Sequence, residues 1–134
     1  RQADALTGLA DRVEREEPSR YLDADIEEAE RGYATAEPLY YTTSIDAAVM
    51  LVPEKNEWWE VYVEKDWVYV EKDWKHHARA QIDIAVQIIT AFGLTPAAAL
   101  TAAALRARAA LLTDGANPAP PKVRTPQTPE NNNG

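Results

Sequence analysis

The sequence predicts an α/β fold of the α+β type, in which helices pack on a three-stranded antiparallel meander. Two observations predict this class. Apolar residues recur at helical spacing before residue 53 and after residue 95. Between them, residues 57–90 are rich in the alternating β-branched and aromatic types that strands prefer. We expect one domain over residues 1–115 and an extended or disordered, Pro- and Asn-rich tail over residues 116–134.

Composition excludes several classes of protein. The 134 residues contain no cysteine, which excludes a disulfide scaffold, a thiolate metal site and a cysteine nucleophile. The formal net charge is −8, and residues 1–31 alone carry ten acids against five arginines. This charge argues against direct nucleic-acid binding, which needs a basic face. No stretch is apolar enough to span a membrane and no signal peptide pattern is present, so we expect a cytoplasmic protein, with the virion as the alternative location.

The N-terminal part predicts two amphipathic helices. Residues 3–16 carry one apolar stripe, and Pro18 ends that helix. Ser19 then caps a second helix, which Gly32 stops, and residues 33–42 follow as a loop. The apolar positions are Leu6, Leu9, Ala10 and Val13 in the first helix and Leu22, Ile26 and Ala29 in the second.

Five carboxylates crowd the other face of the second helix. They are Asp23, Asp25, Glu27, Glu28 and Glu30. Asp23 and Glu27 are four positions apart and share a face, but an oxygen-only cation site needs a loop that brings ligands around the ion. We therefore interpret this face as solvated, with acidic mimicry of nucleic acid as the alternative. Asp23 and Asp46 are also candidates for helix caps or loop anchors.

A short, largely buried helix is predicted between Thr43 and Pro53. Thr43 is the expected N-cap, because Asp46 lies three residues later in an arrangement like a capping box. Pro53 closes the helix, since proline cannot continue the hydrogen-bonding pattern.

One internal repeat lies in the strand region. Residues 61–67 and residues 68–74 both have the sequence VYVEKDW. Because seven is odd and strand side chains alternate with a period of two, one continuous strand would turn the two copies to opposite faces. A turn at each Glu-Lys-Asp removes the conflict. The predicted meander therefore has strands at about 57–64, 67–72 and 76–90.

The third predicted strand alternates isoleucine and valine with other residues. This pattern places Ile82, Ile84, Val86 and Ile88 on one face, which we expect to meet a core. The dipeptide Phe92-Gly93 leads out of the strand.

The last predicted helix is rich in alanine, which allows close packing on a sheet. Thr95 and Pro96 begin it as the N-cap and the first helical residue. It runs to about Leu112, and Asp114-Gly115 ends it.

Three segments together resemble a known family. They are RYLDADI at residues 20–26, YTTSIDAAVMLVPE at residues 41–54 and LTPAAALTAAALRARAAL at residues 94–111. In this order, with a tryptophan-rich strand after the second, they resemble the small phage and prophage proteins of the phage "ABA sandwich" domain, over about residues 5–112. The resemblance implies an α/β/α domain encoded by a temperate phage or prophage, and it implies no catalytic residues. The duplicated VYVEKDW segment and the tail depart from the family pattern.

Aromatic residues gather in the strand region and form the candidate binding site. All four tryptophans fall within 17 residues, and two tyrosines join them. Some of these rings are expected to pack under helices, but six exceed what one sheet face needs. We expect the others to anchor a protein interface or, as the alternative, to stack on nucleobases. The candidate binding residues are Trp58, Trp59, Tyr62, Trp67, Tyr69, Trp74 and Arg79.

We predict no catalytic centre, no metal and no cofactor. The sequence has no Gly-rich phosphate loop, no nucleophile elbow and no Ser-His-Asp order. His76 and His77 are adjacent, so in a strand they point to opposite faces and are poorly placed to share one ion.

The expected function is therefore non-catalytic binding. The leading hypothesis is a phage accessory protein that binds a host or phage protein, as an inhibitor of a host defence factor. One alternative is a virion or assembly component whose tail lies across a neighbouring subunit. The other is a homo-oligomer that sequesters a small nucleotide in an interface pocket of tryptophans and arginines, where Arg79, Arg106 or Arg108 would hold the nucleotide.

Overall fold

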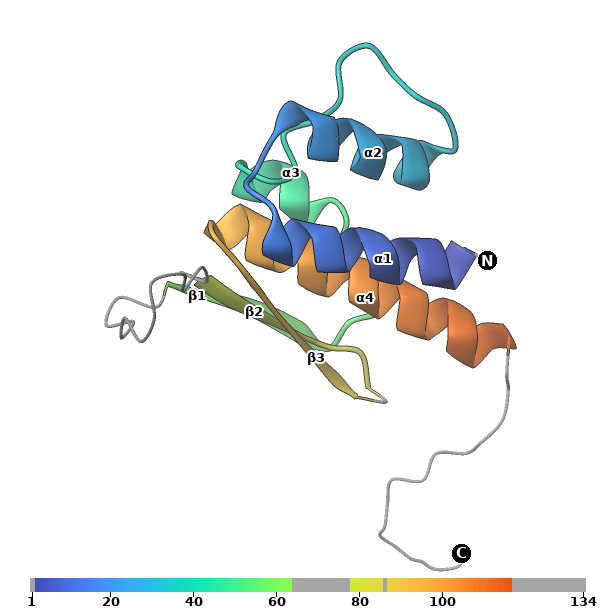
Figure 1. The fold of residues 1–134 in the computed structure, drawn as a ribbon. Helices are drawn as coiled ribbons and strands as arrows, with labels where there is room; N and C mark the ends of the chain where they lie inside the picture. The colour runs from blue at the N-terminus through green and yellow to red at the C-terminus, as the bar shows by residue number, and fades with distance from the viewer. Residues whose placement is uncertain (1, 64–77, 86, 117–134) are drawn as a thin grey trace, which may run out of the picture.

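The computed structural model describes residues 2–63, 78–85 and 87–116 (Figure 1). In these ranges it has four helices and three strands. The helices are α1 (Gln2–Arg15), α2 (Arg20–Arg31), α3 (Ile45–Val49) and α4 (Pro96–Ala116). The strands are β1 (Trp58–Val63), β2 (Ala78–Asp83) and β3 (Ile88–Gly93).

The three strands form an antiparallel meander in the order β1-β2-β3. β1 pairs with β2 from Trp58 opposite Asp83 to Val63 opposite Ala78. β2 pairs with β3 from Ala78 opposite Gly93 to Asp83 opposite Ile88. The predicted fold class, α+β with helices on a three-stranded antiparallel sheet, is confirmed.

The strand boundaries differ from the prediction. The segment expected as one strand over residues 76–90 forms both β2 and β3, which a hairpin turn joins. In this turn the N–H of Ile84 donates to the carbonyl of Gln87 at 3.2 Å. Ala85 takes the left-handed φ of 79°, and its N–H donates to the Asp83 carboxylate at 2.8 Å. The sequence pattern did not indicate this turn, because isoleucine and valine continue to alternate across it and no Gly, Pro or Asn marks it.

The predicted strand at residues 67–72 lies outside the described residues, as does the His76-His77 pair. The same holds for most of the VYVEKDW repeat and for the tail beyond residue 116. The predicted domain boundary and tail therefore stay predictions.

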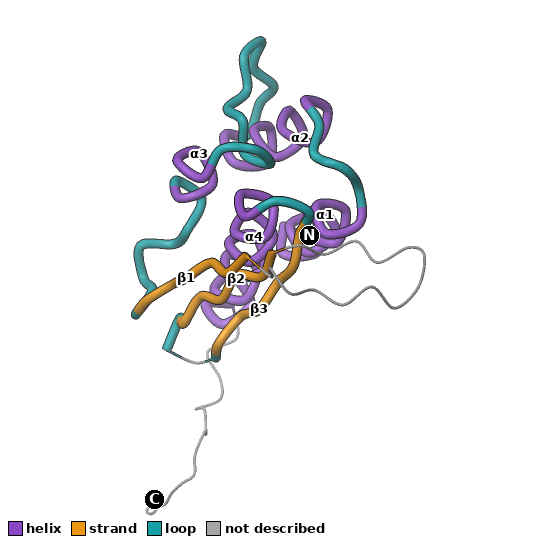
Figure 2. The backbone as a smooth tube through the Cα atoms, turned by 90° about the vertical axis from the view of Figure 1, so that its left-hand side faces the viewer, coloured by secondary structure: helices purple, strands orange, loops and turns teal. Residues whose placement is uncertain are grey.

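The described helices lie on one side of the sheet in two layers, so the predicted α/β/α layering, with helices on both faces of the sheet, is not found in the described residues. α4 and α1 pack against each other and contact the sheet, and α2 and α3 lie beyond them (Figures 1 and 2). The side chains of β2 show that the two faces of the sheet differ in burial. Ala78, Ala80 and Ile82 are fully buried toward α4, whereas the alternate residues of β2 are only partly buried. The core accordingly begins between the sheet and α4, and it continues into α1 and α2, whose residues Leu9, Val13, Leu22 and Ile26 belong to the same buried cluster.

The close approach of α4 to the sheet depends on small residues. Gly93 ends β3, and a Cβ atom at this position would lie only 2.5 Å from the backbone nitrogen of Ala99. Thr95 caps the helix as predicted, because its hydroxyl oxygen accepts from the N–H of Ala98 at 2.9 Å. The predicted helix end is wrong, since α4 continues through Gly115 to Ala116.

The N-terminal helices follow the local signals of the sequence. The predicted apolar stripe of α1 is buried. The Ser19 hydroxyl accepts from the N–H of Leu22, and Gly32 takes the left-handed φ of 89° that ends α2. For α3 the predicted cap is wrong by one residue: Ser44, not Thr43, accepts from the N–H of Ala47 at 3.3 Å. α3 also ends at Val49, before the predicted stop.

Candidate functional site

One face of the sheet carries no helix within residues 2–63, 78–85 and 87–116. Residues that stand opposite each other in the strand register point to the same face. Because the partly buried residues of β2 point away from α4, their partners on β1 and β3 do so as well. We call this surface the open sheet face. It consists of Trp58, Glu60, Tyr62, Arg79, Gln81, Asp83, Ile88, Thr90 and Phe92.

The row at one end of the open sheet face carries large exposed apolar groups. It runs from Trp58 through Asp83 to Ile88 across the three strands. Trp58 is 39% exposed and Ile88 is 52% exposed. Exposed groups of this size on one surface are a common feature of protein interfaces, and tryptophan is an enriched anchor.

The row at the other end places a cation between two aromatic residues. Arg79 on β2 stands between Tyr62 on β1 and Phe92 on β3. The Cζ atom of Arg79 lies 4.7 Å from the centroid of the Tyr62 ring, in a cation–π contact. The Tyr62 hydroxyl donates to the Glu60 carboxylate, and this hydrogen bond raises the pKa of Tyr62. The tyrosine therefore remains a neutral partner for the guanidinium at neutral pH.

The structure brings together part of the predicted binding site. Tyr62 and Arg79 are in contact, and Trp58 shares their face. Trp59 lies on the opposite face beside Ile82, where it remains 37% exposed because β1 is an edge strand. The remaining predicted binding residues, Trp67, Tyr69 and Trp74, lie outside the described residues.

The sequence prediction missed Ile88 and Phe92 as members of the open sheet face. It placed Ile82 and Ile88 on one face of a single strand, and this is wrong. Ile82 is fully buried, whereas Ile88 is exposed on the other face. The one local signal for the intervening turn was Asp83, since aspartate accepts from backbone N–H groups two residues later in turns.

A buried carboxylate, Asp23, fixes the loop that follows α2. Its side chain is 1% exposed. One oxygen accepts from the N–H and the hydroxyl of Thr42, at 2.9 and 2.8 Å, and the other accepts from Arg20 Nη1 at 2.8 Å. Arg20 also donates to the carbonyls of Pro38 and Leu39, at 2.6 and 3.3 Å. The Arg20–Asp23 pair therefore ties the loop to the start of α2.

A second buried carboxylate, Glu27, lies one turn further along α2 and is 2% exposed. Its Oε1 accepts from the Tyr41 hydroxyl at 2.6 Å and from the N–H of Leu39 at 3.4 Å. Its Oε2 accepts from Arg31 Nε at 2.7 Å and from the Thr35 hydroxyl at 3.3 Å. Four donors thus surround a charge that has little contact with solvent.

This environment shifts the pKa values of both partners in the central hydrogen bond. Burial raises the pKa of Glu27, but the hydrogen bonds from Tyr41, the Leu39 N–H and Arg31 outweigh it, so the pKa lies below its usual range. Burial, and then the hydrogen bond to Glu27, raise the pKa of Tyr41. Both shifts favour the ionised glutamate beside a neutral tyrosine.

These contacts correct the interpretation of the acidic face of α2. The prediction that it is solvated is wrong for Asp23 and Glu27, whereas the alternative that Asp23 anchors a loop is confirmed. α4 joins the network, because Thr95 donates to the Thr42 carbonyl at 2.7 Å and Thr101 to the Tyr41 carbonyl at 2.8 Å. The three segments quoted for the resemblance, residues 20–26, 41–54 and 94–111, therefore meet in this framework.

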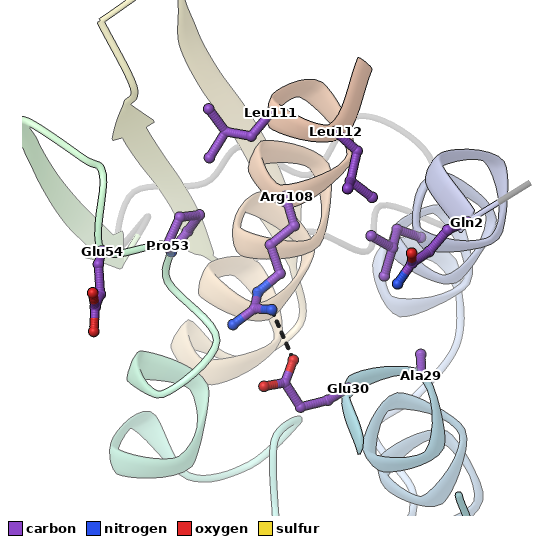
Figure 3. Close-up of a pocket in the computed structure, with 9 residues that line it drawn as sticks. Gln2, Ala29, Glu30, Pro53, Glu54, Arg108, Leu111 and Leu112 are labelled. Atoms are coloured by element: carbon purple, nitrogen blue, oxygen red, sulfur yellow. Dashed lines mark ion pairs between the residues drawn. The ribbon is translucent and has the colours of Figure 1, made fainter. Parts of the chain in front are cut away.

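A pocket of about 430 Å³ opens between α1, α2, α4 and the segment after α3 (Figure 3). We call it the Arg108 pocket. Its apolar walls come from Leu6, Ala29, Pro53, Leu111 and Leu112, and its polar groups from Gln2, Glu30, Glu54 and Arg108. It lies on the helical side of the sheet, away from the open sheet face.

Arg108 is held firmly in this pocket. Its Nε donates to the Leu51 carbonyl at 2.6 Å, and its Nη1 lies 2.9 Å from Glu30 Oε1. The two side chains of this ion pair are 32% and 31% exposed. The third nitrogen, Nη2, has no partner within the described chain.

A second pocket, of about 360 Å³, lies beside α3. Its lining includes Tyr40 and Met50, which are 53% and 64% exposed. The Cζ atom of Arg20 lies 3.6 Å from the centroid of the Tyr40 ring, so the network around Asp23 also orients this tyrosine.

The three arginines named as candidates to hold a small nucleotide lie in three different places. Arg79 belongs to the open sheet face, and Arg108 lies in its pocket. Arg106 connects α4 to α1 through Asp11 at 2.5 Å and Glu14 at 2.8 Å. A nucleotide pocket at an oligomer interface stays a prediction.

The described part of the chain lacks a metal-binding cluster and a membrane-spanning helix. It contains no group of three or more His, Asp or Glu side chains placed to hold a metal ion. None of its helices combines the length and the apolar content that a membrane-spanning segment needs.

Comparisons with models of protein families, with curated proteins and with solved structures found no match for the chain. The resemblance to the phage ABA sandwich domain therefore stays a prediction from the three quoted segments.

Proposed function

We propose that the protein acts by binding a second protein through the open sheet face, without catalysis. The observation that carries this proposal is the contrast between the two faces of one sheet. α4 covers one face, while the other presents Trp58 and Ile88 at 39% and 52% exposure with no described helix over them.

The side chains of the open sheet face are those that contribute most to protein interfaces. Interface anchors are enriched in tryptophan, tyrosine and arginine, and truncation of one anchor costs about 2 kcal/mol or more. Trp58 supplies an anchor at one end of this face, and the stacked pair of Tyr62 and Arg79 supplies another. Three polar residues across the middle, Glu60, Gln81 and Thr90, provide hydrogen-bonding groups that fix the register of a partner.

Charge complementarity specifies the kind of partner. The protein has a formal net charge of −8, so it attracts a basic protein surface at long range. The expected consequence is an association rate that falls as the salt concentration rises.

The proposed setting is that of a phage accessory protein whose partner is a host or phage protein, with inhibition of a host defence factor as the leading role. The support is the resemblance of the three segments, and these lie in the framework around Asp23 and Glu27. The identity of the partner depends on the open sheet face, which the three segments do not supply.

The test compares partner recovery by matched variants. Trp58→Ala removes an anchor of the open sheet face, and Tyr21→Ala removes a ring that is 84% exposed on α2. We expect Trp58→Ala to bind a recovered partner about thirtyfold more weakly than wild type, which corresponds to one interface anchor. Tyr21→Ala should bind as wild type does. Equal affinity of both variants, with both folded by circular dichroism, would contradict the proposal.

A further inference from the structure

We propose that the Arg108 pocket binds a free apolar α-amino acid. The inference rests on the charges and walls of this pocket and is independent of the open sheet face. Its volume of about 430 Å³ lies in the range of small-molecule sites, which are mostly apolar with a few fixed polar groups.

Arg108 is prepared to receive a carboxylate. Two of its three nitrogens are committed, to the Leu51 carbonyl and to Glu30, and these contacts hold the guanidinium in one orientation. Figure 3 shows its other terminal nitrogen turned away from Glu30, toward the side of Pro53 and Glu54. An arginine nitrogen with a fixed direction is a strong and specific donor to a carboxylate.

The two glutamates of the pocket make a simple anion a poor ligand. Glu30 is paired with Arg108, and the carboxylate of Glu54 has no partner among the described residues. With one guanidinium and two carboxylates, the pocket would repel a ligand whose only charged group is a carboxylate. A ligand that carries an ammonium group beside its carboxylate meets Glu54 and Arg108 together, so a zwitterion matches the charges.

The walls specify the rest of the ligand. Leu112 points from α4 toward α1, where Leu6 also lines the pocket, and Leu111 points to the other side of α4, toward Pro53 (Figure 3). An aliphatic side chain of the ligand would be buried against these apolar walls, while the charged groups of the ligand stay at Arg108 and Glu54. The ligand class that fits is an α-amino acid with an apolar side chain, for which L-leucine is the probe.

The first experiment titrates the full chain with L-leucine, N-acetyl-L-leucine and L-leucinamide at millimolar concentrations, observed by methyl NMR. We expect L-leucine to shift the methyl signals of Leu6, Leu111 and Leu112. The acetyl derivative lacks the ammonium group and the amide lacks the carboxylate, so each should bind about tenfold more weakly, the equivalent of one charge-assisted hydrogen bond. Equal affinity for the three compounds, or no shift with L-leucine, would overturn the proposal.

The second experiment uses variants that separate the two charges. Glu54→Gln should weaken L-leucine about tenfold and leave N-acetyl-L-leucine unchanged, because only the former carries the ammonium group. Arg108→Lys should weaken both. Arg12→Lys is the matched control for Arg108→Lys, since Arg12 is also in an ion pair, with Glu16 and Asp25, but lies outside the pocket. Unchanged leucine affinity in Glu54→Gln would overturn the assignment of the ammonium site.

Discussion

Replacement of Glu27 by alanine tests the buried framework. The carboxylate is 2% exposed and accepts four hydrogen bonds, of which those from the Tyr41 hydroxyl and Arg31 are the shortest, at 2.6 and 2.7 Å. A hydrogen bond to a charged group contributes about 1.5–3 kcal/mol, and loss of one partner of a buried charge pair costs about 3–5 kcal/mol. Arg31 is 45% exposed and regains water, so the dominant loss is the buried Tyr41 hydroxyl left without its acceptor. We therefore expect Glu27→Ala to lower the free energy of unfolding by about 3 kcal/mol.

The assay is urea unfolding followed by far-UV circular dichroism. Glu28→Ala is the matched control, because Glu28 is the next residue of the same helix and its side chain is exposed. It should change the free energy of unfolding by less than about 0.5 kcal/mol. If Glu27→Ala also costs less than about 1 kcal/mol, the reasoning that the loop depends on this carboxylate is refuted.

Three further predictions concern pH and backbone geometry. The pKa of Glu27 lies below its ordinary value of 4.5, so its contribution to stability is present above that pH and is lost as the pH falls further; the unfolding free energy of Glu27→Ala should depend less on pH in this acid range. Gly93→Ala should cost roughly 1–3 kcal/mol in thermal unfolding, because the added Cβ meets the Ala99 nitrogen at 2.5 Å, whereas Gly8→Ala, with nothing within 4 Å, should stabilise α1. Ala85→Gly should raise the melting temperature, since the φ of 79° costs alanine about 1 kcal/mol; an unchanged melting temperature would contradict the strain at this turn.

Local signals in the sequence predicted the helices well. The apolar stripe of α1, the Ser19 cap and the Gly32 stop each depend on residues within one or two turns, and the structure has all three. Thr95 as the cap of α4 is of the same kind. Short-range geometry determines these features, so they can be predicted from a single sequence.

The hairpin between β2 and β3 was not predictable in the same way. Ile82 and Ile88 fit one alternating strand, and the reversal at Ala85 uses a left-handed alanine that local propensity disfavours. Pairing with β1 and burial under α4 determine where the chain turns. The open sheet face was therefore predicted only in part, through Trp58, Tyr62 and Arg79.

The burial of Asp23 and Glu27 was also not predictable from the local sequence. A carboxylate on a helix is normally solvated, and the environment of Asp23 and Glu27 depends on a loop that starts more than five residues away. One signal was present in the sequence. Asp23 and Glu27 each follow an apolar residue of the buried stripe, Leu22 and Ile26, so they border the face that packs against the rest of the chain.

Site-specific photocrosslinking tests the central claim that the open sheet face binds a protein. A photoreactive amino acid replaces Ile88, which is 52% exposed on that face, and in a second variant it replaces Tyr21, which is 84% exposed on α2. After irradiation in the presence of the recovered partner, we predict a crosslinked complex with the probe at position 88 and none with the probe at position 21. Crosslinking from position 21 alone would contradict the account and place the interface on the helical side.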